Sequence, residues 1–265
     1  MKTNGKLITL NNVTKKYGGK TIIEGVSHTF YKGESIAFYG HNGCGKSTML
    51  KLISGLIPIS FGELKYHERL RFSYVPEKFV GMEIEMIDYL RAVERMEGVD
   101  PAVTDSLIED FFLDPMIHTR MDKLSKGSLQ KVGVLQALMA PHEVILLDEP
   151  LSGQDAESQK VFIDKMKELR ECGITILMSC HEKKLIEALS DRVYTIENGK
   201  LAAIDASGEA EYSIYVKKNS MLTVRHDMRS NGGRYELTAE EAALKATVLG
   251  LYEDGWEVVG IEKHA

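Results

Sequence analysis

Hydrophobic residues in this chain gather in short runs between glycine and polar residues, a pattern that predicts strands. The run Val144–Leu147 contains no polar position, as expected for a strand buried on both faces of a parallel sheet. Ile36–Tyr39 predicts a second buried strand, and Ile174–Ser179 predicts a third. We therefore expect an α/β fold built on a mainly parallel sheet.

The N-terminal segment has shorter apolar stretches that are interrupted by turn residues. Leu7–Leu10 and Thr21–Ile23 predict strands on either side of the turn-rich segment Tyr17–Lys20. Val26–Tyr31 predicts a further strand, which the turn Lys32–Glu34 separates from the strand at 36–39. Consecutive short strands of this kind predict an antiparallel β layer beside the parallel sheet.

Helical patterns occupy much of the remaining sequence. Ser47–Ile53 predicts a helix shortly after the strand at 36–39. Glu83–Glu97 and Val103–Leu113 predict two more helices, with Gly98–Pro101 as the break between them. Apolar positions along the first of these two, such as Ile84, Ile87 and Leu90, lie largely on one face.

Residues 206–265 show a separate, mixed pattern, and Ala206–Glu209 resembles a linker. Ile214–Val216, Met221–Arg225 and Trp256–Ile261 predict strands, while Thr238–Glu241 matches a capping box that predicts the start of a helix. The apolar stripe of that helix would be Leu244, Val248, Leu251 and Tyr252. We expect a small accessory α+β domain, for which a packing extension and a sensor or dimerisation role are both open.

Composition narrows the class of protein. Of 265 residues, 43% are hydrophobic and 27% charged, as in ordinary globular proteins. Acidic residues outnumber basic ones by 39 to 33, so the net charge of −6 argues against a nucleic-acid partner. The first residues lack the apolar core of a signal peptide, and the three cysteines lack metal-type pairing. These features predict a cytoplasmic protein with reduced thiols.

The segment between the strand at 36–39 and the helix at 47–53 matches the phosphate-loop motif G-x-x-x-x-G-K-[ST]. Small residues let the backbone fold tightly, so that amide N–H groups point inward toward an anion, and the positive end of the helix adds to their effect. Lys46 would reach the β- and γ-phosphates, and the Ser47 hydroxyl would ligate Mg²⁺. The predicted nucleotide site comprises Gly40, His41, Asn42, Gly43, Cys44, Gly45, Lys46, Ser47 and Thr48.

Two carboxylates follow the strand at 144–147. Because ligands of α/β sheets bind at the carboxyl ends of the strands, Asp148 is placed to hold Mg²⁺ and Glu149 to polarise an attacking water as general base. His181 follows the strand at 174–179 and would lie at the same edge, where it could donate to a γ-phosphate or position water. Upstream, Tyr17 could stack on a base or could simply cap the packing.

These motifs, in this order, resemble the nucleotide-binding subunit of ATP-binding cassette (ABC) transporters. The segment Leu124–Lys131 resembles the family's Leu-Ser-Gly-Gly-Gln signature, keeping Leu124, Ser125 and Gly127. Lys126 replaces the first glycine of the signature, and Ser128 replaces the glutamine. Among the family members that this form resembles, a lysine at the first glycine is commonest in exporter-type cassettes. The resemblance implies that Ser125, Gly127 and the helix behind them close over the ATP of a second cassette, head to tail.

The resemblance extends to further residues. Tyr17 matches the family's adenine-stacking aromatic residue, and His181 matches its switch histidine. Leu151–Asp155 resembles the D-loop, in which Asp155 would cross the dimer interface. The resemblance implies a P-loop NTPase core at 1–205 with a helical insert at about 78–140, leaving 206–265 as the accessory domain. Glu77 stands where the family has glutamine. An ionised glutamate only accepts hydrogen bonds, so it could ligate the metal but would disfavour closure through its negative charge.

The resemblance also implies a function. We expect an ATPase that binds ATP and Mg²⁺, pairs with itself or with a related cassette, and drives separately encoded transmembrane permease subunits from the inner face of the cell membrane. The alternative is an ABC-type ATPase switch that acts on protein or nucleic-acid assemblies without a membrane partner. A weakly hydrolysing regulatory cassette is a third possibility, supported only by Glu77.

Overall fold

The computed structural model describes residues 5–204, 211–217, 228–231, 234–240, 247–248, 250–251 and 253–263. The chain divides into two compact units, at 1–204 and 205–265. Among the described residues, no helix is long and apolar enough to cross a membrane.

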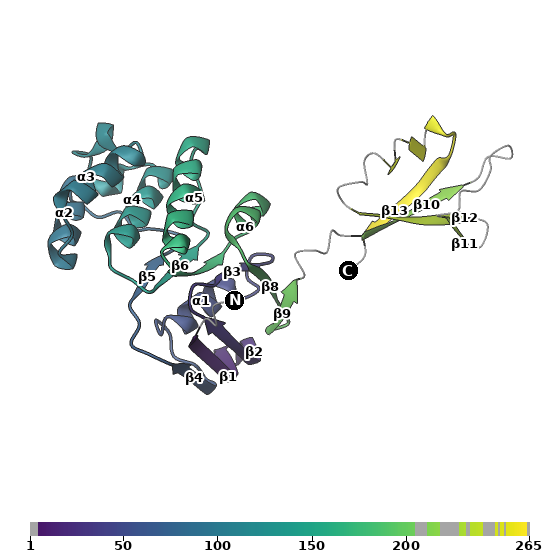
Figure 1. The fold of residues 1–265 in the computed structure, drawn as a ribbon, viewed down its shortest axis with the longest axis horizontal. Helices are drawn as coiled ribbons and strands as arrows, with labels where there is room; N and C mark the ends of the chain where they lie inside the picture. Colours follow the sequence, from purple (N-terminus) through teal and green to yellow (C-terminus); the bar gives the residue numbers. More distant parts are fainter. Residues whose placement is uncertain are drawn as a thin grey trace. The chain divides into compact units, whose positions relative to one another are not determined.

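The first unit is built on a six-stranded sheet (Figure 1) whose strand order is β5-β6-β7-β3-β8-β9. The first five strands in this order are parallel, and β9 is antiparallel to β8. The prediction of a mainly parallel sheet is therefore confirmed. In chain order the strands are β3 (Ser35–Tyr39), β5 (Phe72–Val75), β6 (Val144–Asp148), β7 (Thr175–Ser179), β8 (Arg192–Glu197) and β9 (Lys200–Ile204).

Alternate residues of β6 pack against different hydrophobic cores, which explains its continuous apolar sequence. Val144 and Leu146 join a core formed with α1 (Lys46–Ile53) and the antiparallel layer. Ile145 and Leu147 join a core on the other face of the sheet. Because every side chain of β6 is buried, the strand is fixed in register between its neighbours.

The antiparallel layer consists of three strands in the order β2-β1-β4, namely β1 (Lys6–Tyr17), β2 (Lys20–Tyr31) and β4 (Phe61–Tyr66). The predicted pair of strands at 21–23 and 26–31 is in fact one strand. Gly25, at φ 61°, lies at an irregularity in the β1–β2 register, which the chain passes without leaving the sheet.

Helices cover the sheet and extend beyond it. The insert comprises α2 (Met86–Glu97), α3 (Pro101–Asp110) and α4 (Lys126–Met139), with two 3₁₀ turns at Asp114–Met116 and Met121–Lys123. Both α2 and α3 begin and end close to the predicted bounds, and Asp100 caps α3 by accepting from the Ala102 N–H. Figure 1 shows α4 between these two helices and α5 (Ala156–Glu171). The last helix of this unit is α6 (Lys183–Leu189).

The second unit has an antiparallel sheet in the order β11-β12-β10-β13. Its strands are β10 (Glu211–Lys217), β11 (Arg229–Asn231), β12 (Arg234–Glu240) and β13 (Glu257–Lys263). Ile214, Leu237, Leu251 and Trp256 form its own hydrophobic core. Residues 247–248 and 250–251 are helical, as expected, whereas the predicted strand at 221–225 lies outside the described residues.

The predicted capping box is wrong, because Thr238 and Ala239 lie inside β12 rather than at the start of a helix. Leu237 and Ala239 are buried and Thr238 between them is exposed, an alternation that requires a strand. Burial of alternate apolar residues thus overrides the local capping preference of the threonine.

Candidate functional site: a phosphate loop at the carboxyl edge of a parallel sheet

The segment between β3 and α1 forms a tight loop that only glycine permits at several positions. Gly40, Gly43 and Gly45 have φ angles of 147°, 85° and 117°, values that side-chain-bearing residues rarely adopt. A Cβ atom on Gly45 would also come within 3.1 Å of Ile23 and 3.3 Å of Ile22. Gly45 is the N-cap of α1, so the positive end of that helix is directed at the loop.

Lys46 is buried within this loop. Its ammonium group donates to the carbonyl oxygens of Gly40 at 2.7 Å and His41 at 3.3 Å, and lies 3.6 Å from Glu149 Oε1. The side chain therefore folds back over the loop and places a positive charge where a phosphate group would enter.

Asp148, at the end of β6, accepts hydrogen bonds from three hydroxyl groups. Its Oδ1 accepts from Ser47 Oγ at 2.8 Å and from Ser179 Oγ at 2.5 Å, while its Oδ2 accepts from the Tyr74 hydroxyl at 2.9 Å. Burial, together with the neighbouring Asp148 charge, raises the pKa of Tyr74, so the phenol stays protonated and remains a donor. Asp148 is 1% exposed and is held in one orientation.

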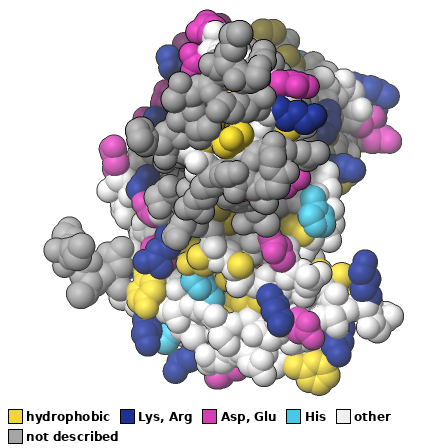
Figure 2. Space-filling model, turned by 90° about the vertical axis from the view of Figure 1, so that its right-hand side faces the viewer, with side chains coloured by type: hydrophobic (Ala, Val, Ile, Leu, Met, Phe, Trp, Pro, Cys, Tyr) yellow, Lys and Arg dark blue, Asp and Glu magenta, His cyan; other side chains and the backbone are white. Residues whose placement is uncertain are grey.

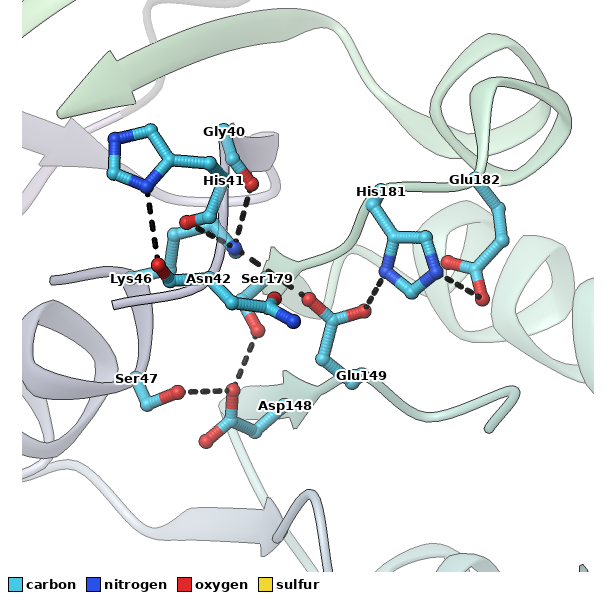
Figure 3. A network of polar contacts seen from close by, with 10 residues as sticks. All are labelled: Gly40, His41, Asn42, Lys46, Ser47, Asp148, Glu149, Ser179, His181 and Glu182. Carbon is cyan, nitrogen blue, oxygen red and sulfur yellow. Dashed lines mark hydrogen bonds and ion pairs between the residues drawn. The ribbon is translucent and has the colours of Figure 1, made fainter. Parts of the chain in front are cut away.

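Glu149 adopts an unusual backbone conformation, with φ 48°, and its N–H donates to the Ser179 carbonyl at 3.0 Å. Its Oε2 accepts from His181 Nδ1 at 2.7 Å, while its Oε1 is buried, faces Lys46 and accepts no hydrogen bond from any described residue. Figure 3 shows this carboxylate between the lysine and the histidine. A left-handed backbone at a non-glycine residue costs free energy and is typical of functional sites.

A cavity of about 350 Å³ opens over the loop. Tyr17 lies on its wall and is 48% exposed, with Lys15 Nζ 4.7 Å from the centre of its ring. Cys44, which the sequence placed in the nucleotide site, packs against the hydrophobic core and does not line the cavity. The lining residues are Tyr17, Ile22, Asn42, Gly43, Gly45, Lys46, Ser47, Thr48, Glu77 and Glu149.

Ser125, which is exposed, and Gly127, which is buried, lie at the start of α4 and do not line this cavity. Ser125 is the N-cap of α4 and accepts from the Ser128 N–H at 3.1 Å. The Lys126 ammonium group donates to Ser152 Oγ at 2.8 Å. A Cβ atom on Gly127 would lie 2.1 Å from the Gly153 carbonyl oxygen, so only glycine allows the signature and the D-loop to pack this closely.

Asp155 is the N-cap of α5, an intrachain role that the sequence analysis did not include. The backbone N–H of Ser158 and the ammonium group of Lys131, at 2.9 Å from its Oδ2, hold the pKa of Asp155 below its usual range. Lys131 also donates to the Phe111 carbonyl at 3.2 Å. Because Lys131 lies on α4, this ion pair joins the signature helix to the D-loop.

Three partners of the predicted site residues were not expected from the sequence, namely Tyr74, Ser179 and Lys131. Ser179 is the last residue of β7 and pairs with Asp148, the last residue of β6, in the parallel sheet. Placing the ends of the two predicted strands side by side would have indicated this contact. Tyr74 and Lys131 make contacts between elements distant in sequence, and no local pattern signals them.

A phosphate loop, an anchored aspartate and an adjacent glutamate at the carboxyl edge of a parallel sheet define a P-loop nucleoside triphosphatase. A model of the ABC transporter family matches residues 23–152. An uncharacterized ABC transporter ATP-binding protein of Methanocaldococcus jannaschii is 31% identical over 73% of this chain and 75% of its own length. The zinc import ATP-binding protein ZnuC of Mannheimia succiniciproducens is 31% identical over 72% of each chain.

Similarity also extends into the second unit and to solved structures. The ABC transporter ATP-binding protein YhcH of Bacillus subtilis is 28% identical over 97% of this chain and 83% of its own length. The structure of an ATP-binding subunit of an ABC transporter superposes with a TM-score of 0.67 at 27% identity, covering 75% of this chain and 90% of that one. The chain belongs to the ATP-binding subunits of ABC transporters and is an ATPase.

The close contact at Gly127 generates a prediction about the signature. Gly127→Ala should lower the free energy of unfolding by about 1–3 kcal/mol, because the new methyl group meets a backbone carbonyl that cannot move aside. Lys126→Ala, which loses only an exposed contact, should change stability by less than about 1 kcal/mol. Urea denaturation followed by far-ultraviolet circular dichroism measures both, and equal stability of Gly127→Ala and wild type would contradict the close packing.

Proposed function

We propose that the chain binds Mg-ATP in the cavity over the phosphate loop. Tyr17 stacks on the base, the loop amides and Lys46 hold the phosphates, and Ser47, Asp148 and Glu77 provide oxygen ligands for Mg²⁺. The 2.8 Å contact between Ser47 Oγ and Asp148 Oδ1 supports this metal position, because it brings together the hydroxyl and carboxylate oxygens that Mg²⁺ prefers. The bound ion would neutralise charge on the β- and γ-phosphates.

Glu149 is the proposed general base. Its hydrogen bond with His181 is the observation that supports this role most directly. The carboxylate lies between two groups that also suit a γ-phosphate, the Lys46 ammonium group and the His181 ring. When ATP enters, Lys46 and His181 turn to the phosphate, and Glu149 is released to orient and deprotonate the attacking water. Hydrolysis then rests on positioning and electrostatic stabilisation.

We propose that two cassettes, either identical or related, pair head to tail around two ATP molecules. The signature residues Ser125 and Gly127 do not line the cavity of their own chain, which supports a role opposite the phosphate loop of a second chain. The N-terminus of α4 would direct its free N–H groups at that γ-phosphate. Asp155 would reach the interface from the D-loop.

We further propose that unit 1–204 is the ATPase domain, that 205–265 is an accessory domain, and that separately encoded permease subunits hold the protein at the inner face of the cell membrane. Exposed hydrophobic side chains on and beside the insert support permease docking, with Val80 76% and Met96 82% exposed. Acidic and basic side chains are interspersed on the face drawn in Figure 2, and the net charge is −6, which does not favour nucleic acid.

The alternative of an ABC-type switch without a membrane partner is not favoured, because the curated relatives are ATP-binding proteins of transporters. The association of Lys126 with exporter-type cassettes stays a prediction. Glu77 lines the cavity together with Glu149, so the regulatory cassette with slow turnover is the second candidate function.

Turnover of the purified chain tests the proposed chemistry. Glu149→Gln should keep ATP affinity and lose about 10²–10⁴-fold in kcat, because an amide cannot accept the proton of water. Lys46→Met should lose ATP binding itself, and Lys51→Met on the same helix serves as its control. The assignments fail if Glu149→Gln turns over ATP at the wild-type rate, or if Lys46→Met binds ATP as tightly as wild type.

Glu77→Gln tests the effect of the extra carboxylate. The repulsion between the Glu77 carboxylate and the negative charges of Glu149 and the phosphates amounts to about 1 kcal/mol. Its removal should therefore raise kcat about fivefold. The same change should raise the concentration of free Mg²⁺ needed for half-maximal turnover, because an anionic oxygen ligand is lost. Glu109→Gln, on the exposed surface of α3, is the control. An unchanged kcat and Mg²⁺ dependence would remove Glu77 from the site.

A further inference from the structure

We propose that Glu149, His181 and Glu182 form a binding site for Zn²⁺ or another divalent ion that prefers imidazole ligands, and that this ion, when bound, stops ATP hydrolysis. The site is separate from the Mg²⁺ position assigned to Ser47 and Asp148. Its inhibitory effect rests on the proposed function, because Glu149 and His181 are also the proposed general base and switch residue.

The three side chains converge from two neighbouring strands. Glu149 follows β6, while His181 and Glu182 follow β7. One donor atom from each residue lies within 4.8 Å of the other two. His181 Nδ1 is 2.7 Å from Glu149 Oε2, and His181 Nε2 is 3.9 Å from Glu182 Oε1. Figure 3 shows the imidazole ring between the two carboxylates.

The two contacts involve different nitrogens of the ring, and one ion binds only one of them, so the His181 ring would turn to bring that nitrogen and one oxygen of each carboxylate around the ion. Bonds from Zn²⁺ to imidazole nitrogen and carboxylate oxygen measure about 2.0–2.2 Å, so the ligands of one ion are separated by about 3–3.5 Å. The ring of His181 is 62% exposed, which leaves it room to turn and gives the ion a path from solvent. Water would complete the coordination.

Both carboxylates have an oxygen atom for which the described residues provide no hydrogen-bond donor. Glu149 Oε1 and Glu182 Oε2 are each buried and accept no hydrogen bond. Burial of an anionic oxygen without a donor is unfavourable, and a cation compensates for it. Lys46 Nζ lies 3.6 Å from Glu149 Oε1, and a divalent ion would add positive charge beside both carboxylates.

The chemistry of the donors favours Zn²⁺ over Mg²⁺. Imidazole suits zinc, copper and nickel ions, whereas Mg²⁺ prefers oxygen ligands alone. Cys180 directly precedes His181, but its side chain packs in the hydrophobic core, and burial raises the pKa of this thiol to about 12. Because the thiol is enclosed in that core and is absent from the cluster of donor atoms, the site offers nitrogen and oxygen ligands.

A metal ion in this position would hold the two groups that hydrolysis needs. Glu149 bound to the ion could not accept the proton of water, and His181 bound to it could not turn toward the γ-phosphate. The loop amides and Lys46 would remain available, so Zn²⁺ should lower kcat more than it lowers the affinity for ATP.

Glu182→Gln separates this site from the machinery of hydrolysis, because Glu182 has no assigned role in turnover. Without Zn²⁺, the full chain carrying Glu182→Gln should hydrolyse Mg-ATP like wild type. With Zn²⁺, half-inhibition should require at least about tenfold more metal, since the loss of a ligand weakens binding. Glu171→Gln, on the exposed surface of α5, should keep the wild-type sensitivity. Equal inhibition of wild type and Glu182→Gln would overturn the proposal.

Calorimetric titration of Zn²⁺ into the protein without nucleotide tests binding independently of activity. Wild type should bind one ion, His181→Ala should lose it, and Cys172→Ser, which removes an exposed thiol, should keep it. Co²⁺ as a spectroscopic probe should show no thiolate charge-transfer band. Loss of binding in Cys172→Ser, or no binding by wild type, would overturn the site. If the chain never hydrolyses ATP, the proposed function fails, while this titration still decides the metal site.

Discussion

The hydrogen bonding of Asp148 at the end of β6 is the interaction on which the nucleotide site depends. Three hydroxyl groups reach this one carboxylate, from Ser47 on α1, Ser179 on β7 and Tyr74 on β5. Each comes from a different element, so the arrangement exists only when the three parallel strands and the helix are in register. Burial of every residue of β6 fixes that register, because a slip of one position would exchange the two faces of the strand.

Glu149 follows the fixed side chain of Asp148, and a bound phosphate could change the contacts of its carboxylate. Its left-handed backbone turns the chain sharply after Asp148, which brings its carboxylate between Lys46 and His181. One negative group therefore contacts two groups that a γ-phosphate would also attract. In the proposed mechanism, the γ-phosphate replaces the carboxylate at Lys46 and His181 and so frees Glu149 to act as general base. An ion bound to Glu149 and His181 would block that exchange.

The sequence predicted the parts of the fold that local pattern determines. Val144–Leu147 and Ile36–Phe38 lie in strands because continuous apolar runs require burial on both faces. Gly40 and Gly45, the fixed glycines of the motif, adopt backbone angles that favour glycine. Local pattern failed where tertiary packing decided the outcome. The sequence predicted two strands on either side of Gly25, but β2 continues through this residue. The segment predicted as a helix-capping box at 238–241 lies mostly in strand β12. The bonds of Tyr74 to Asp148 and of Lys131 to Asp155 join distant segments, so only the fold reveals them.

The central claim, a site shared between two cassettes, is tested most directly by mixing two inactive variants. In the proposed dimer, Lys46→Met would disable the phosphate loop, and Ser125→Asp would keep a helix N-cap but place a negative charge opposite the partner's γ-phosphate. Each variant alone should lack ATPase activity. A mixture should regain turnover, because a mixed dimer pairs the intact loop of one chain with the intact signature of the other. An inactive mixture in which mixed dimers are shown to form, or full activity of Ser125→Asp alone, would contradict the account.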